Sequence, residues 1–174
     1  MKKLVSSLFI ACAVLVASSC GNGKDKQDIQ APAGMVALDL TKYGKPFAIF
    51  VPDTTSAKLQ VVEQSWGALE ISVGKGFRLS IKEEAGDIEL KKSDIKADEV
   101  NKFKSFVVEE PTTIFWESEI TKPEFHLYSV QKLGNSAYLF EDFSTADSEP
   151  LSKDAVQKML DSAKNLKETK KADA

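Results

Sequence analysis

The stretch "GALEISVGKGFRLSIKEE", residues 67–84, decides the fold class of this chain. Apolar and polar or small side chains alternate strictly along both of its halves, and a Gly-Lys-Gly turn joins the halves. Alternation of this kind is typical of a strand with one buried and one wet face, and the glycines suit a tight turn. The stretch therefore predicts a β-hairpin. The apolar side chains of its buried face are Leu69, Ile71, Val73, Phe77, Leu79 and Ile81.

Further strands are expected on both sides of this hairpin. A second hairpin is predicted in "EFHLYSVQKLGNSAYLFEDF", residues 124–143, with its turn at Gly134–Asn135. Short apolar or alternating runs predict three more strands, at residues 36–40, 46–52 and 112–120.

Two helices complete the expected fold. Residues 151–167 carry one apolar stripe at helical spacing, and Ser152 is placed to cap the first turn. Residues 93–106 have partial helical spacing and predict a second helix. The chain is thus expected to be α+β: a mostly antiparallel sheet built from hairpins, packed by a C-terminal amphipathic helix and one further helix. The order of these segments resembles the layout of PsbP-type α/β/α sandwiches. The stripe consists of Val156, Met159, Leu160, Ala163 and Leu166.

The amino end has the pattern of an export signal. Two lysines precede an apolar run from Leu4 to Ala17, which is shorter than the ~20 residues that a spanning helix needs. Small residues and Cys20 follow, so the segment resembles the lipobox of bacterial lipoproteins, with Ala17 where Leu is favoured. The resemblance implies cleavage between Ser19 and Cys20 and a lipid on Cys20. The alternatives are an ordinary cleaved signal peptide and lipidation of Cys12.

This interpretation divides the chain into four parts. Residues 1–19 are the signal peptide, and residues 20–34 are the lipid anchor and a polar tether that spans roughly 20 Å as a coil. Residues 35–167 form a single domain, and residues 168–174 form a disordered tail. The resemblance implies a cell-envelope location, and Gly21 after the cysteine favours the outer over the inner membrane in a bacterium that has both.

Charge narrows the range of partners. Without residues 1–19 the chain has 21 cationic and 26 acidic residues, a net charge of −5. Such a domain is not expected to bind nucleic acid, which requires a basic surface. The expected partners are the membrane, through Cys20, and an envelope protein or a small apolar ligand.

Catalytic patterns are sparse. His126 is the sole histidine, which excludes an H-E-x-x-H zinc site, and the "VGKGF" turn lacks the Ser or Thr that a P-loop requires. No metal and no cofactor are expected. His126 shares a strand face with Tyr128, and Glu117 and Glu119 share another, which keeps a hydrolase that uses these residues as an alternative.

Two tryptophans are candidates for stacking on a ligand. Trp66 precedes a glycine at the edge of a predicted strand, and Trp116 lies inside one. Together with the anchor and the missing catalytic motifs, they favour a non-catalytic binding module. A carrier of a small apolar ligand or lipid is the second hypothesis, and the hydrolase is the third.

Overall fold

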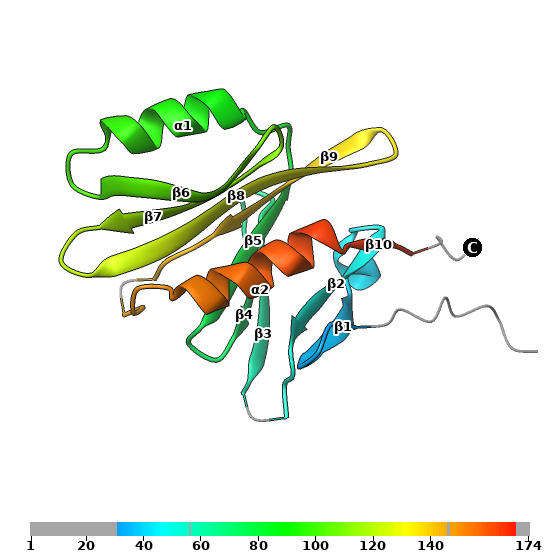
Figure 1. The fold of residues 1–174 in the computed structure, drawn as a ribbon. Coiled ribbons are helices and arrows are strands. Elements are labelled where there is room, and N and C mark those ends of the chain that lie inside the picture. Colours follow the sequence, from blue (N-terminus) through cyan, green and yellow to red (C-terminus); the bar gives the residue numbers. More distant parts are fainter. Residues whose placement is uncertain (1–30, 56, 146, 170–174) are drawn as a thin grey trace, which may run out of the picture.

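The computed structural model describes residues 31–169, apart from residues 56 and 146. Its main element is a seven-stranded antiparallel sheet, and a three-stranded sheet lies beside it (Figure 1). The strand order in the large sheet is β3-β4-β5-β9-β8-β7-β6. Its strands are β3 (Leu59–Glu63), β4 (Leu69–Val73), β5 (Phe77–Glu83), β6 (Lys102–Glu110), β7 (Thr113–Glu119), β8 (Pro123–Leu133) and β9 (Ser136–Asp142).

Both predicted hairpins are present. β4 and β5 pair with Ile71 opposite Leu79, and both of these side chains are fully buried. β8 and β9 turn at Gly134, whose φ of 58° is a conformation that glycine adopts without steric cost. Because β5 also pairs with β9, the two hairpins form the centre of one continuous sheet.

The small sheet has the order β1-β2-β10. Its middle strand is β2, the proline-bounded apolar run, and its residues from Phe47 to Val51 are all buried. A short 3-10 helix, η1, joins β1 to β2. Glu168, in the stretch predicted as a tail, pairs with Phe47. The bounds of the remaining segments are β1 (Met35–Asp39), η1 (Thr41–Tyr43), β2 (Phe47–Pro52) and β10 (Lys167–Glu168).

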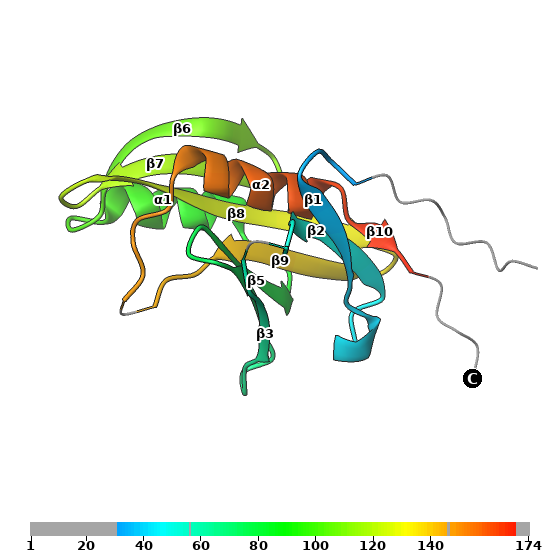
Figure 2. The ribbon, with the colours of Figure 1, turned by 90° about the horizontal axis from the view of Figure 1, so that it is seen from below.

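The C-terminal helix α2 (Lys153–Lys164) forms as the sequence predicts. The Ser152 hydroxyl accepts a hydrogen bond from the Ala155 N–H and so caps the first turn. The apolar stripe packs against β2, β5, β8 and β9, so this helix covers one face of the large sheet and also contacts the small one (Figure 2). The α2 side chains that are buried in this layer are Val156, Met159, Leu160, Ser162 and Ala163.

The second helix is not where the sequence predicted it. Residues 93–106 were expected to be helical, but helix α1 spans Ile88–Ala97 and β6 begins at Lys102. The helix stops because the Asp98 carboxylate accepts hydrogen bonds from the N–H groups of Val100 and Asn101, which stabilises a turn. Pairing with β7 then holds the following residues in a strand.

The two helices lie on opposite faces of the large sheet. Successive side chains of β7 point in opposite directions: Phe115 belongs to the core under α2, whereas Ile114 and Trp116 belong to a smaller cluster under α1. In Figures 1 and 2, α1 lies at one end of the molecule and the small sheet at the other. The α+β class, with hairpin-built antiparallel sheets and a packed C-terminal helix, is therefore confirmed. Within the described residues, no helix combines the length and hydropathy needed to cross a membrane.

Candidate functional site

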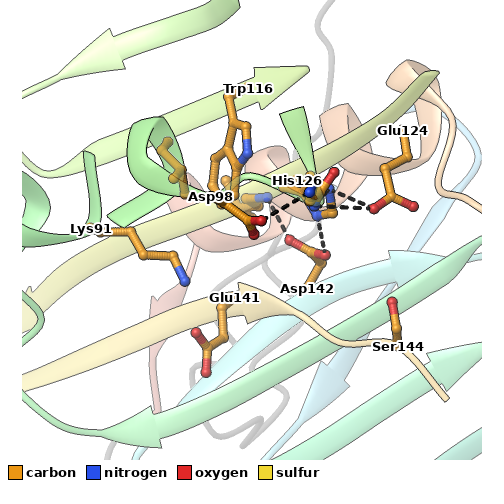
Figure 3. Close-up of a pocket in the computed structure, with 11 residues that line it drawn as sticks. Lys91, Asp98, Trp116, Glu124, His126, Glu141, Asp142 and Ser144 are labelled. Carbon is orange, nitrogen blue, oxygen red and sulfur yellow. Dashed lines mark hydrogen bonds and ion pairs between the residues drawn. The ribbon is translucent and has the colours of Figure 1, made fainter. Parts of the chain in front are cut away.

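The sole histidine, His126 of β8, lies at the centre of a hydrogen-bonded cluster (Figure 3). Its Nδ1 atom is 3.0 Å from Oδ2 of Asp142. Its Nε2 atom is 3.0 Å from Oε1 of Glu124 and 2.9 Å from Oγ of Ser118. Polar oxygens therefore contact both nitrogens of the ring.

Strand pairing positions the ring against an indole. His126 lies opposite Trp116 of β7, and the two rings stack with their centroids 5.0 Å apart and their planes at 26°. Trp116 is only 6 % exposed. The α1 residue Lys91 lies above this layer, with its ammonium 5.9 Å from the Trp116 ring and 5.2 Å from the Tyr128 ring. The helix thus covers the back of the cluster.

Asp142 connects the His126 ring to the backbone of β8, the strand that carries the ring. One carboxylate oxygen contacts His126, and the other accepts a hydrogen bond from the Leu127 N–H at 2.7 Å. No pattern in the sequence marks Asp142. Tyr128 pairs with Glu141, so simple alternation places the next residue, Asp142, on the face opposite His126. Its position at the last residue of β9 allows the side chain to reach the ring nonetheless.

The turn after α1 closes another side of the cluster. The Asn101 amide donates to Glu124 at 3.4 Å, and its nitrogen lies 3.5 Å from Nε2 of His126. Oδ1 of Asn101 is buried and has no hydrogen-bond partner. This carbonyl oxygen is an acceptor that a bound donor could satisfy. No motif in the sequence marks Asn101, Glu124 or Ser118.

The groups around His126 shift the pKa of its ring. Burial by itself lowers the pKa of His126, but the hydrogen bonds and negative charges of Asp142 and Glu124 outweigh it, and the pKa is raised above its ordinary value of 6.5. The protonated ring donates from both nitrogens, which matches a carboxylate at each. The cluster therefore favours the imidazolium form.

The cluster opens into a pocket of about 330 Å³ beside α1. Four carboxylates line it, and the cationic groups in its lining are Lys91 and His126. Figure 3 shows Lys91 and Asp98 on one side of the ring and Glu124 on the other. Lys82 of β5 partly neutralises the pocket by pairing with Glu141 at 2.6 Å. The carboxylates are Asp98, Glu124, Glu141 and Asp142.

The structure brings together only some of the residues that the sequence singled out. Trp116 and His126 meet in the cluster, whereas Glu117 and Glu119 alternate with Trp116 and Ser118 along β7 and so point to the other face of the sheet. Glu119 forms an ion pair with Lys104 at 2.8 Å. Trp66 lies on a separate turn and is 64 % exposed. Cys12, Ser19 and Cys20 are outside the described residues.

Ser118, His126 and Asp142 form a hydrogen-bond chain in the order of a serine hydrolase triad. Ser118 is, however, only 1 % exposed, and Glu124 shares the Nε2 atom that would have to activate it. In the part of the chain that the structure describes, no group of three His, Cys, Asp or Glu residues is arranged to hold a metal ion.

Comparison of this chain with protein-family models, with curated proteins and with solved structures finds no significant match. A functional hypothesis must therefore rest on the residues of the pocket themselves.

Proposed function

We propose that this chain is a lipoprotein, anchored through Cys20, whose α+β domain binds a polar ligand in the His126 pocket without chemical turnover. One observation carries the binding role. A histidine whose two nitrogens both contact carboxylates lies in a pocket of about 330 Å³, within the ~300–1,000 Å³ range of small-molecule sites.

Carboxylates contact both ring nitrogens of His126, which argues against general-base catalysis by this residue. A general base needs a free lone pair within reach of the substrate proton. Here Asp142 contacts Nδ1, Glu124 contacts Nε2, and the raised pKa favours the form without a lone pair. The pocket supports hydrogen bonding better than proton abstraction.

The lining indicates the kind of ligand. Oδ1 of Asn101 lacks a donor, and the pocket carries an excess of carboxylates over cationic groups. A ligand that brings N–H or O–H groups would satisfy these acceptors. Trp116 and Ile95 supply apolar contacts in the same lining. We therefore propose a small molecule, or a side chain of an envelope protein, that is rich in hydrogen-bond donors.

The packing favours this ligand over an apolar one. Fully buried side chains such as Phe47, Phe140 and Met159 occupy the layer between the large sheet and α2. A carrier of lipid needs an apolar cavity, whereas the His126 pocket is lined mainly by charged and polar groups.

Native mass spectrometry of the purified full chain tests the binding role. Asn101→Leu replaces the unsatisfied carbonyl by an apolar side chain, and Leu90→Ala changes an exposed residue of α1 as the matched control. A small molecule bound to the unsubstituted chain should be lost from Asn101→Leu and retained by Leu90→Ala. Identical spectra for all three proteins would contradict the proposal.

The anchor is tested separately. Cys20→Ser should leave a chain that keeps residues 1–19 and carries no lipid, because both the lipidation site and the cleavage site are removed. A variant that stays membrane-bound at the mass of the unsubstituted chain would refute the lipid anchor. It would not bear on the proposed binding of a ligand in the His126 pocket.

The triad-like order of Ser118, His126 and Asp142 supports a second candidate, a serine hydrolase. A fluorophosphonate probe reacts with activated serines, so labelling of Ser118 that disappears in His126→Gln would favour this candidate. Because Ser118 is 1 % exposed, we expect no labelling.

A further inference from the structure

Arg78 of β5 is the sole arginine of the chain, and it is only 5 % exposed. Its Nε donates to the Phe143 carbonyl at 3.0 Å, and its terminal nitrogens donate to the carbonyls of Glu149, at 2.8 Å, and of Lys75. Phe143 directly follows β9, Glu149 precedes α2, and Lys75 lies in the turn between β4 and β5. One guanidinium therefore joins three separate segments through their backbones.

The geometry of these contacts requires an arginine. A guanidinium is planar and donates in several fixed directions, whereas a lysine ammonium is a single point of charge on a flexible stem. Burial lowers the pKa of Arg78, and the negative charges of Asp142 and Glu124 oppose this lowering. The two carboxylates that contact the His126 ring are thus also within electrostatic reach of Arg78.

At the end of β9 the chain leaves β8 but stays with β5. The pairing of β9 with β8 ends at Glu141, whereas its pairing with β5 continues to Asp142. Phe143 extends the second pairing, since its N–H donates to the Arg78 carbonyl at 3.3 Å while its own carbonyl accepts from Nε of Arg78. Arg78 therefore holds the chain that follows Asp142 against β5.

The Asp142 side chain fills the place beside β8 that the backbone leaves. Beyond the last β8–β9 pair, the Phe125 N–H donates to the Leu151 carbonyl at 3.1 Å and the Leu127 N–H donates to Oδ1 of Asp142 at 2.7 Å. The carboxylate thus acts in place of a backbone carbonyl, and its second oxygen lies 3.0 Å from Nδ1 of His126 (Figure 3). This arrangement explains how Asp142 contacts a ring that alternation places on the other face.

We infer that Arg78 is a positioning residue of the His126 pocket: by holding Phe143 on β5, it directs the Asp142 carboxylate to Nδ1 of His126. Without this contact, we expect the residues after Asp142 to pair with β8 and the carboxylate to move away from the ring. The consequence for ligand binding rests on the proposed function.

The pKa of His126 reports the position of Asp142, because the hydrogen bond and charge of Asp142 raise it. NMR of the ring protons measures this pKa directly, since the chain has one histidine. Arg78→Lys removes the three carbonyl contacts but leaves every charge near the ring in place, so a change in pKa would arise from geometry. The charged and titratable groups near the ring are Glu124 and Tyr128 of β8, Glu141 and Asp142 of β9, Arg78 and Lys82 of β5, Lys91 of α1 and Asp98 after it.

Arg78→Lys should lower the pKa of His126 by about 1 unit, the size of a lost carboxylate contact, and Asp142→Asn should lower it by a similar amount. The double variant should match Asp142→Asn, because Arg78 acts through Asp142. Lys75→Gln is the matched control: it removes an exposed charge but keeps the carbonyl that Arg78 contacts, and should leave the pKa unchanged. An unchanged pKa in Arg78→Lys, or additive decreases in the double variant, would overturn the inference.

A measurement on the unsubstituted chain decides the question if Arg78→Lys does not fold. Because the chain has one arginine, its Nε–H gives a single assignable NMR signal. The signal should exchange slowly with solvent, since the group is buried and bonded to Phe143, and it should shift with the same midpoint as the His126 ring. Rapid exchange, or no response to the titration of His126, would contradict the inference.

Native mass spectrometry separates this inference from the proposed function. Arg78→Lys should lose the small molecule that the unsubstituted chain carries. A lowered His126 pKa in Arg78→Lys, with no ligand on the unsubstituted chain, would support the role of Arg78 and refute the proposed function. An unchanged pKa, with ligand bound to both proteins, would refute the role of Arg78 and leave the proposed function standing.

Discussion

The two helices pack on opposite faces of one sheet but do so in different ways. α2 buries five of its residues in the main core, and Val156, Met159 and Ala163 are inaccessible to solvent. α1 buries only Ile88 and leaves Leu90 59 % exposed. Lysines hold α1 in other ways: Lys91 lies over the Trp116 and Tyr128 rings, and Lys92 forms an ion pair with Glu109 of β6 at 2.7 Å.

The fold therefore depends mainly on α2, whereas the pocket depends on α1. Removing apolar area from water stabilises α2 on the sheet, whereas the partly buried cation–π contacts and ion pairs of α1 each contribute about 1–2 kcal/mol or less. α1 can therefore shift by small amounts while the main core stays packed. The pocket that we propose as a binding site lies at the edge of α1, the less firmly packed of the two helices.

Truncating one apolar side chain in each helix should give the largest difference in the free energy of unfolding. Met159→Ala removes a fully buried side chain and should lower the free energy of unfolding by about 2–5 kcal/mol. Leu90→Ala removes an exposed one and should change it by no more than about 0.5 kcal/mol. Urea unfolding measures both. Similar losses for the two variants would contradict the contrast between the helices.

A methyl group at Gly86 should displace α1 selectively. A Cβ there would lie 2.7 Å from the Tyr128 hydroxyl and 2.7 Å from a Val130 methyl, so Gly86→Ala should cost about 1–3 kcal/mol through overpacking. Gly76→Ala is the matched control, because no atom lies within 4 Å of its Cβ. Hydrogen exchange should show faster exchange in α1 than in the unsubstituted chain, with α2 unchanged. Loss of protection in both helices would show that α1 is not independent.

The smallest expected effect is a pH dependence that comes from His126. The pKa of His126 is raised in the folded chain, so its contribution to stability is complete below about pH 6.5 and is lost as the pH rises through the folded pKa. The free energy of unfolding should therefore decline from pH 6.5 upward in the unsubstituted chain. Urea unfolding at several pH values measures the decline.

His126→Gln supplies the control for this decline, because the chain has no other histidine. The difference in unfolding free energy between the two proteins should shrink as the pH rises. A difference that grows with pH would mean that the ring is held neutral in the folded chain, against the effect of Asp142 and Glu124.

Local patterns predicted the hairpins and α2 because their signals are contained within single segments. The alternation in residues 67–84 and the stripe from Val156 to Leu166 each report a buried face directly. The helix predicted at 93–106 failed because two effects outside simple periodicity decided that segment. These are the turn stabilised by Asp98 and the pairing of β6 with β7.

The site was less predictable than the fold. The sequence places His126 and Tyr128 on one face, and the structure confirms this, since both belong to the layer under α1. Glu124 lies two residues before His126 on β8, so strand alternation places it on the same face. The other partners of the ring come from β7, β9 and the turn after α1, and only the sheet order brings them to it. Alternation along β9 would even have excluded Asp142.

The small sheet determines how the molecule responds to mechanical force. β1 is an edge strand that pairs with β2 through five residues, and Met35, its first residue, lies opposite Pro52 at the open end of the pair. A pull on the amino end, directed away from the sheet, breaks these pairs one after another instead of all together. β2 stays in place through its buried side chains and its contacts with α2. β1 can therefore peel away and re-pair under an intermittent pull while the His126 cluster, on another sheet, keeps its geometry.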